Sequence, residues 1–118
     1  MSRILGTILP ILFATSFAHA GQVLVSCDLS SAAFAAYAVD DIEIRKTAQG
    51  LKTDVIDSGN SSYFSEQNIT GTTLPNQIDL SSFSEFADAI NPRLYLEKNV
   101  WYFEDDSHAD PLACTTLK

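Results

Sequence analysis

A segment near the C-terminal end of this chain constrains the fold more than any other, because its side chains alternate about a short turn. With Lys98-Asn99 as the turn, three side-chain pairs lie opposite one another: Leu94 with Phe103, Leu96 with Trp101, and Tyr95 with Tyr102. Opposite side chains in a β-hairpin share a face. The apolar pairs therefore predict a face that packs on a core, and the tyrosine pair predicts a face open to water or to a partner.

A second hairpin is predicted over residues 41–57, in which Gly50 can adopt the positive φ that a tight turn needs. Pairing outward from a Gln49-Gly50 turn gives four opposite pairs: Ile44 with Val55, Ala48 with Leu51, Arg45 with Asp54, and Thr47 with Lys52. The first two pairs form an apolar face, and the last two form a polar face that carries a cross-strand ion pair. A half-buried hairpin sorts its residues in this way, whereas a helix does not.

Further segments complete the prediction of a mainly β fold. Residues 22–29 alternate and predict a strand, and residues 112–117 predict a closing strand. Residues 30–39 fit either a short helix or a strand. Ser82-Phe83-Ser84-Glu85 matches a capping box, which predicts a helix of about two to three turns that Asn91-Pro92 ends. The expected architecture is a small antiparallel sheet or partly closed barrel with one short helix.

The two cysteines, Cys27 and Cys114, lie near opposite ends of this predicted domain. An isolated pair in a small exported domain predicts a disulfide, which here joins the N-terminal and C-terminal strands. A loop of this length stabilises by roughly 4–5 kcal/mol in the chain-entropy treatment. A catalytic or metal-bound cysteine has less support, because the sequence contains no Cys-x-x-Cys motif.

The first twenty residues predict a secretory signal peptide. Arg3 provides the positive start, residues 4–18 are mostly apolar, and Ala18-His19-Ala20 places small residues before Gly21. The apolar run is shorter than the roughly 20 residues that span a bilayer. We therefore expect residues 1–20 to be removed, residues 21–118 to form a single domain without a membrane span, and the product to be secreted or periplasmic. The alternative is a membrane-tethered lipoprotein, because Leu24-Val25-Ser26-Cys27 is similar to a lipobox whose cysteine carries lipid.

The chain is acidic, with a formal net charge of −8. Removal of Arg3 leaves 6 basic against 15 acidic side chains, or −9. Nucleic acids and anionic membranes attract clustered Lys and Arg, so they are disfavoured as partners. A basic protein is the partner that the charge favours. The sequence does not specify an oligomeric state.

Candidate sites gather around residues 95–110. Tyr95, Tyr102, Asp105 and Asp106 are the residues that we expect to contact a partner. A weaker hypothesis is a metal site formed by Asp106, His108 and Asp110, which alternate and would point together along an extended segment. Two triplets, beginning at Asn60 and Asn68, match the N-glycosylation pattern.

No catalytic motif or cofactor fingerprint is present. A Ser–His–acid hydrolase could use only His108, the one histidine after residue 20, and no Gly-x-Ser-x-Gly elbow accompanies any serine. The sequence therefore predicts no catalytic residue and no cofactor. The expected function is a small, exported, non-catalytic binding protein, with inhibition of a cationic protein as one form of that role. The alternative is an envelope protein that binds a metal or a small ligand.

The predicted architecture loosely resembles that of small periplasmic lysozyme inhibitors, in which a β-sheet domain binds a cationic enzyme. The local similarity is Asp57-Ser58-Gly59 followed by Tyr63. The resemblance implies a cationic partner. It assigns no role to any residue of this chain.

Overall fold

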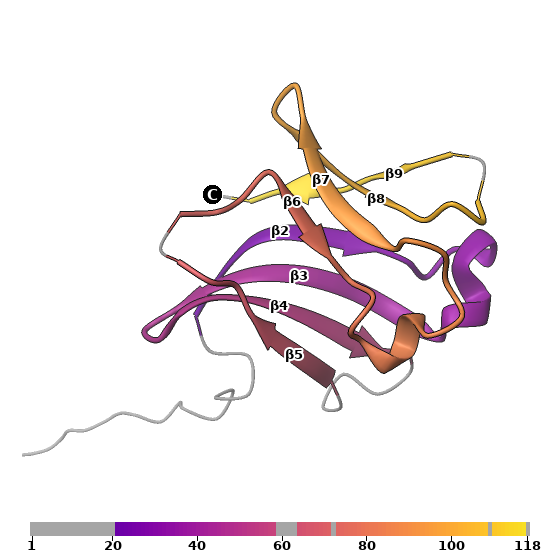
Figure 1. The fold of residues 1–118 in the computed structure, drawn as a ribbon, viewed down its shortest axis with the longest axis horizontal. Coiled ribbons are helices and arrows are strands. Elements are labelled where there is room, and N and C mark those ends of the chain that lie inside the picture. Colours follow the sequence, from indigo (N-terminus) through magenta and orange to yellow (C-terminus); the bar gives the residue numbers. More distant parts are fainter. Residues whose placement is uncertain (1–20, 59–63, 72, 109, 118) are drawn as a thin grey trace, which may run out of the picture.

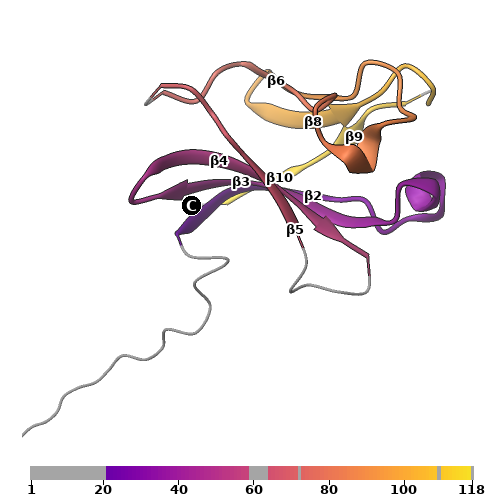
Figure 2. The same cartoon turned by 60° about the horizontal axis from the view of Figure 1, so that its bottom comes forward.

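The computed structural model describes residues 21–58, 64–71, 73–108 and 110–117. The predicted signal peptide, Gly59, Tyr63 and the sequon at Asn60 lie outside these ranges. The described chain folds into two antiparallel sheets that form separate layers (Figures 1 and 2). No described helix has the length and apolar character that a bilayer crossing requires.

The larger sheet has five strands in the order β10-β2-β3-β4-β5. Their bounds are Thr115–Thr116 for β10, Gln22–Asp28 for β2, Val39–Thr47 for β3, Gly50–Asp57 for β4 and Phe64–Asn68 for β5. The smaller sheet has the order β6-β7-β8-β9. Its bounds are Gln77–Asp79 for β6, Arg93–Glu97 for β7, Val100–Glu104 for β8 and Leu112–Ala113 for β9. The mainly β prediction is confirmed, in the form of a two-layer sandwich and not of a closed barrel.

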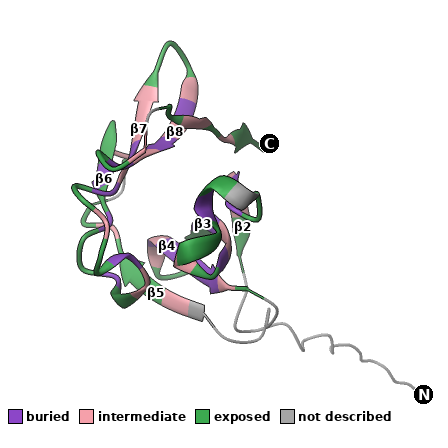
Figure 3. Cartoon of the chain, turned by 90° about the vertical axis from the view of Figure 1, so that its right-hand side faces the viewer, coloured by how far each residue is buried: buried purple, intermediate pink, exposed green. Residues whose placement is uncertain are grey.

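The core lies between the two sheets, where alternate side chains of both layers meet. The larger sheet contributes Ile42, Ile44 and Val55, which are fully buried. The smaller sheet contributes Leu94 and Phe103, also fully buried, and buried segments follow β2, β3 and β8 in Figure 3. Alternation along each strand then sends the intervening side chains to the outer faces.

The β7–β8 hairpin has the predicted register. Leu94 pairs with Phe103, Leu96 with Trp101, and Tyr95 with Tyr102. Lys98 and Asn99 both have positive φ, at 52° and 68°. Two central residues with positive φ match the twist of the flanking strands, so this two-residue turn fixes the register.

The β3–β4 hairpin forms, but its predicted register is wrong by two residues. Ile44 pairs with Thr53 and Arg45 pairs with Lys52. The turn lies at Ala48-Gln49, because the Thr47 hydroxyl donates to the Gly50 carbonyl at 3.0 Å and accepts from the Gln49 amide at 3.1 Å. A shift of two residues keeps every side chain on its face. Arg45 and Asp54 therefore still form the expected ion pair, diagonally, with Nε 2.9 Å from Oδ2.

The C-terminal segment passes from one sheet to the other. Strand β9 pairs with β8 in the smaller sheet, and β10 pairs with β2 in the larger sheet. Cys114 lies between these strands, and its sulfur bonds to that of Cys27 in β2. The predicted disulfide is confirmed, and it joins the two layers where the chain crosses. A sulfur in this bond is not available to a lipid, so the structure favours the disulfide over a lipoprotein anchored through Cys27.

At the opposite side of the sandwich, β5 and β6 are the outermost strands of their sheets. A pocket of about 220 Å³ separates them, and both strands contribute to its walls. The pocket is lined by Thr53, Gln67, Asn68, Ile69, Pro75, Gln77, Ile78 and Asp79. The disulfide and the strands β9 and β10 join the sheets along one side, whereas β5 and β6 do not pair along the other, where the chain crosses between them.

Two short 3-10 helices cap one end of the sandwich. Helix η2, Ala32–Tyr37, precedes β3, so residues 30–39 combine a helical turn with the start of a strand. Helix η3, Ser84–Phe86, is shorter than the helix predicted there, and no side chain caps it. The prediction of a capping box is wrong because Glu85 accepts a hydrogen bond from the Ser65 hydroxyl of β5, at 2.8 Å, instead of reaching back along its own turn.

Candidate functional site

The outer face of the smaller sheet carries the predicted tyrosine pair. Strand register places Gln77, Tyr95, Tyr102 and Ala113 in one row across the four strands. The neighbouring row contains Asp79, Arg93 and Glu104. We call the surface formed by these seven residues, together with Glu97 and Val100, the tyrosine face. The inward-facing neighbours on the same strands belong to the core, so this face points away from it.

The rings of Tyr95 and Tyr102 stack, with centroids 5.4 Å apart and planes inclined by 26°. Both side chains are half-buried. The Arg93 guanidinium lies over the Tyr95 ring, with Cζ 6.0 Å from its centroid. Burial, followed by the nearby Glu104 carboxylate, raises the pKa of Tyr95, so its hydroxyl stays protonated at neutral pH. The pair offers a flat aromatic surface with two hydroxyl groups.

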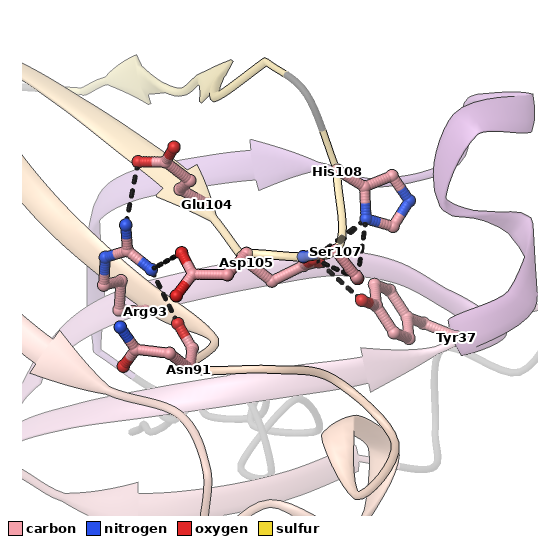
Figure 4. A network of polar contacts seen from close by, with 8 residues as sticks. Tyr37, Asn91, Arg93, Glu104, Asp105, Ser107 and His108 are labelled. Carbon is pink, nitrogen blue, oxygen red and sulfur yellow. Dashed lines mark hydrogen bonds and ion pairs between the residues drawn. The ribbon is translucent and has the colours of Figure 1, made fainter.

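Arg93 holds together one edge of the tyrosine face. Its Nη2 is 3.0 Å from Glu104, and its Nη1 is 3.1 Å from Asp106 and donates to the Asn91 carbonyl at 2.8 Å (Figure 4). Asp106 is half exposed, with 50% of its side-chain surface accessible. The face and its edge thus carry four carboxylates, those of Asp79, Glu97, Glu104 and Asp106, and Arg93 pairs with the last two. The face is negatively charged.

The loop after β8 contains a buried carboxylate, that of Asp105. Its Oδ2 accepts a hydrogen bond from the Tyr37 hydroxyl at 2.5 Å. Its Oδ1 accepts from the Ser107 amide at 2.8 Å and also from the Ser107 hydroxyl. Burial by itself raises the pKa of Asp105, but hydrogen bonds from Ser107, Tyr37 and His108 outweigh it and lower the pKa to about 2. Burial and the same carboxylate raise the pKa of Tyr37 to about 12.

His108 connects this loop to helix η2. Its Nδ1 lies 3.0 Å from both Asp105 oxygens (Figure 4). Its Nε2 lies 2.8 Å from the Ala33 carbonyl. Both ring nitrogens face acceptors, so the protonated imidazolium satisfies both contacts. The hydrogen bonds to Asp105 and then to Ala33 raise the pKa of His108. The Phe34 ring packs against the imidazole, with centroids 4.8 Å apart.

These contacts hold the loop after β8 against helix η2. The Ser107 hydroxyl donates to Asp105, and its oxygen lies 3.4 Å from His108 Nδ1, while the second imidazole nitrogen faces the Ala33 backbone carbonyl. Serine and histidine therefore share the Asp105 carboxylate as their common partner.

The structure separates the residues predicted to contact a partner. Tyr95, Tyr102 and Asp106 lie on or beside the tyrosine face. Asp105 is 0% exposed and faces the interior, so it supports the loop and offers no surface to a partner. This is a correction to its predicted role. The carboxylate is buried because the hydroxyl of Tyr37, 68 residues away, donates a hydrogen bond to it.

The predicted metal ligands are also divided. His108 and Asp110 line one pocket of about 320 Å³, whereas Asp106 pairs with Arg93. Within the described ranges, no group of three or more His, Cys, Asp or Glu side chains is arranged to hold a metal ion.

No family model, curated protein or solved structure matches this chain. The resemblance to small periplasmic lysozyme inhibitors therefore stays a prediction from sequence.

Sequence analysis missed two residues of this region. Arg93 could have been found, because the register that pairs Leu94 with Phe103 also pairs Arg93 with Glu104. Tyr37 gave no signal, because its contact with Asp105 depends on how helix η2 packs against a distant loop.

Proposed function

We propose that this protein is an exported, non-catalytic binding domain that presents the tyrosine face to a basic protein. The observation that carries the proposal is the stacked, half-exposed pair of Tyr95 and Tyr102 beside carboxylates that outnumber Arg93. Tyrosine and arginine are enriched among the residues that dominate binding energy at protein interfaces.

The geometry of the face favours binding at low entropic cost. The tyrosines lie on adjacent strands of a hairpin whose turn fixes their register, and the two rings already contact one another. Little side-chain freedom remains to be lost when a partner binds. The excess of carboxylates complements a basic surface and accelerates encounter with it at low salt.

The disulfide supports an export route for this role. Bonded cysteines persist in oxidising compartments and are rare in the reducing cytosol. Together with the signal peptide predicted over residues 1–20, this supports a secreted or periplasmic location, where a basic enzyme would be available as the partner.

The proposal is tested with two basic proteins, a lysozyme and a cytochrome c, titrated calorimetrically at low and at moderate salt. The lysozyme is chosen because of the sequence resemblance, and the cytochrome c is a basic protein of another fold. We expect binding to the lysozyme that weakens with salt. We expect Tyr102→Ala to weaken it by about 2 kcal/mol, as at an interface hot spot. Asp106→Asn should mainly slow association.

Glu66→Gln is the matched control, because it removes one exposed carboxylate from the larger sheet, where Glu66 pairs with Lys52 at 3.4 Å. It should leave binding nearly unchanged. The proposal fails if neither basic protein binds at low salt. It also fails if Tyr102→Ala and Glu66→Gln have equal effects, or if both basic proteins bind alike and both are released by salt, which indicates charge attraction alone.

A further inference from the structure

A third pocket lies at the turn between β3 and β4, in a part of the chain that is distant in sequence from the tyrosine face. Its volume is about 490 Å³. Three leucines supply most of its apolar wall: Leu24 from β2, Leu51 from β4 and Leu74 from the segment between β5 and β6. The remaining lining residues are Gln22, Lys46, Thr47, Ala48 and Gly50. A volume of this size lies within the range of about 300–1,000 Å³ typical of small-molecule sites.

The charge of this pocket is opposite to that of the protein. The chain has 15 acidic side chains, yet none lines the pocket, whereas Lys46 does. Lys46 belongs to the inward-facing set of β3, two residues after Ile44, and it lies where the core ends. An exposed ammonium beside leucine side chains is an arrangement that suits an anion with an apolar body.

Lys46 also differs from most of the other basic residues that the structure describes. Arg45 pairs with Glu43 and Asp54, Lys52 with Glu66, and Arg93 with Glu104 and Asp106. Across residues 21–58, 64–71, 73–108 and 110–117, no ion pair forms at Lys46 or at Lys98. Of these two, only Lys46 lines a pocket. Its charge is therefore available to a ligand.

We propose that this pocket binds a small monocarboxylate with an aliphatic body. The carboxylate meets the Lys46 ammonium at the rim, and the aliphatic chain packs against Leu24, Leu51 and Leu74. The Thr47 hydroxyl is not part of the recognition, because it already donates to the Gly50 carbonyl within the turn. Apolar burial supplies most of the affinity, and Lys46 selects the anion over a neutral molecule of the same length.

This site is independent of the tyrosine face. Lys46 lies on the larger sheet, and the tyrosines lie on the smaller one. Loss of binding to a basic protein and loss of binding to a carboxylate are therefore separate results. The pocket gives a location to the small-ligand function that the sequence left as an alternative.

The test uses the exported protein with decanoate and 1-decanol as probes, below the concentration at which decanoate forms micelles. Calorimetric titration should show that decanoate binds more tightly than decanol. Lys46→Gln keeps a polar side chain, one atom shorter, and removes its charge. It should weaken decanoate binding about threefold, the size expected for an exposed charge pair, and leave decanol binding unchanged.

Lys98→Gln is the matched control, because Lys98 is the other described lysine without an ion pair and lies in the β7–β8 turn. It should change neither affinity. Leu74→Ser should weaken both probes, since it removes part of the apolar wall, and methyl resonances of Leu51 and Leu74 should shift on titration. The proposal is overturned if decanoate does not bind, if it binds no more tightly than decanol, if Lys46→Gln behaves like Lys98→Gln, or if the shifts map elsewhere.

Discussion

Replacement of Asp105 by asparagine tests whether the buried carboxylate stabilises the loop through its charge. Asparagine keeps the shape of the side chain but replaces one acceptor oxygen by an amide. That amide would then face the donor groups of Tyr37, Ser107 or His108. The matched control is Asp106→Asn, one residue further along, where the side chain is half exposed and pairs with Arg93.

The size of the effect follows from the pKa of Asp105, about 2 in the folded protein against an ordinary value of 3.8. Linkage gives about 2.4 kcal/mol of stabilisation at pH 5. The folded-state pKa is lowered, so this stabilisation is present above about pH 4 and is lost as the pH falls through 2. It decreases to about 1.3 kcal/mol at pH 3 and about 0.4 kcal/mol at pH 2.

Urea unfolding of the wild-type protein and both variants at pH 5, 4, 3 and 2 measures this dependence. Over this range His108 stays protonated in both folded and unfolded states, because the pKa of the folded His108 lies above its ordinary value of 6.5. The difference between wild type and Asp105→Asn should shrink by about 2 kcal/mol from pH 5 to pH 2. For Asp106→Asn it should stay below about 1 kcal/mol throughout. A difference for Asp105→Asn that does not change with pH would refute the reasoning.

Three further outcomes are expected. Replacing Cys27 and Cys114 by alanine removes a link across 87 residues. Calorimetry should show that the free energy of unfolding falls by about 4.6 kcal/mol and the melting temperature by roughly 20 °C or more. A loss of unfolding free energy below about 2 kcal/mol would contradict the chain-entropy treatment. Burial, then Asp28 and other carboxylates, raise the pKa of Asp41 to about 6, so the wild type loses stability as the pH rises. In urea unfolding, Asp41→Asn should therefore be more stable than the wild type by about 1–2 kcal/mol above pH 6 and should lose this advantage towards pH 4. Equal stability at pH 7 would contradict this. Thr53→Val should stabilise by about 1 kcal/mol, since no described group pairs with the buried Thr53 hydroxyl, and destabilisation would indicate a hidden partner.

Sequence reasoning succeeded where neighbouring residues decide the structure. The β7–β8 hairpin follows from alternation about a two-residue turn, and each predicted pair is present. The β3–β4 hairpin shows the limit of this reasoning, because the preference of Gly50 for a turn suggested one register and the hydroxyl of Thr47 selects another. Faces were predictable in both hairpins because a shift of two residues does not change them.

Long-range contacts were beyond the reach of local patterns. Asp105 and Asp106 are adjacent and chemically identical, yet one is fully buried and the other half exposed. The difference depends on Tyr37, which packs beside the loop only after both layers have assembled. The helix predicted after Ser82 failed for a similar reason, because Ser65 of another strand takes the carboxylate of Glu85. Local signals also did not show that the two hairpins belong to different sheets.

Because the C-terminal segment passes between the sheets, one long edge of the sandwich is mechanically stronger than the other. The strong edge is the segment β9–Cys114–β10. It is linked to β2 by the disulfide and by the Leu117 amide, which donates to the Leu24 carbonyl at 2.8 Å. The weak edge is formed by β5 and β6, which face one another across a pocket and not across a ladder of hydrogen bonds. Local unfolding on heating should therefore begin at the weak edge. Amide hydrogens of β5 and β6 should exchange with solvent before those of β2 and β8.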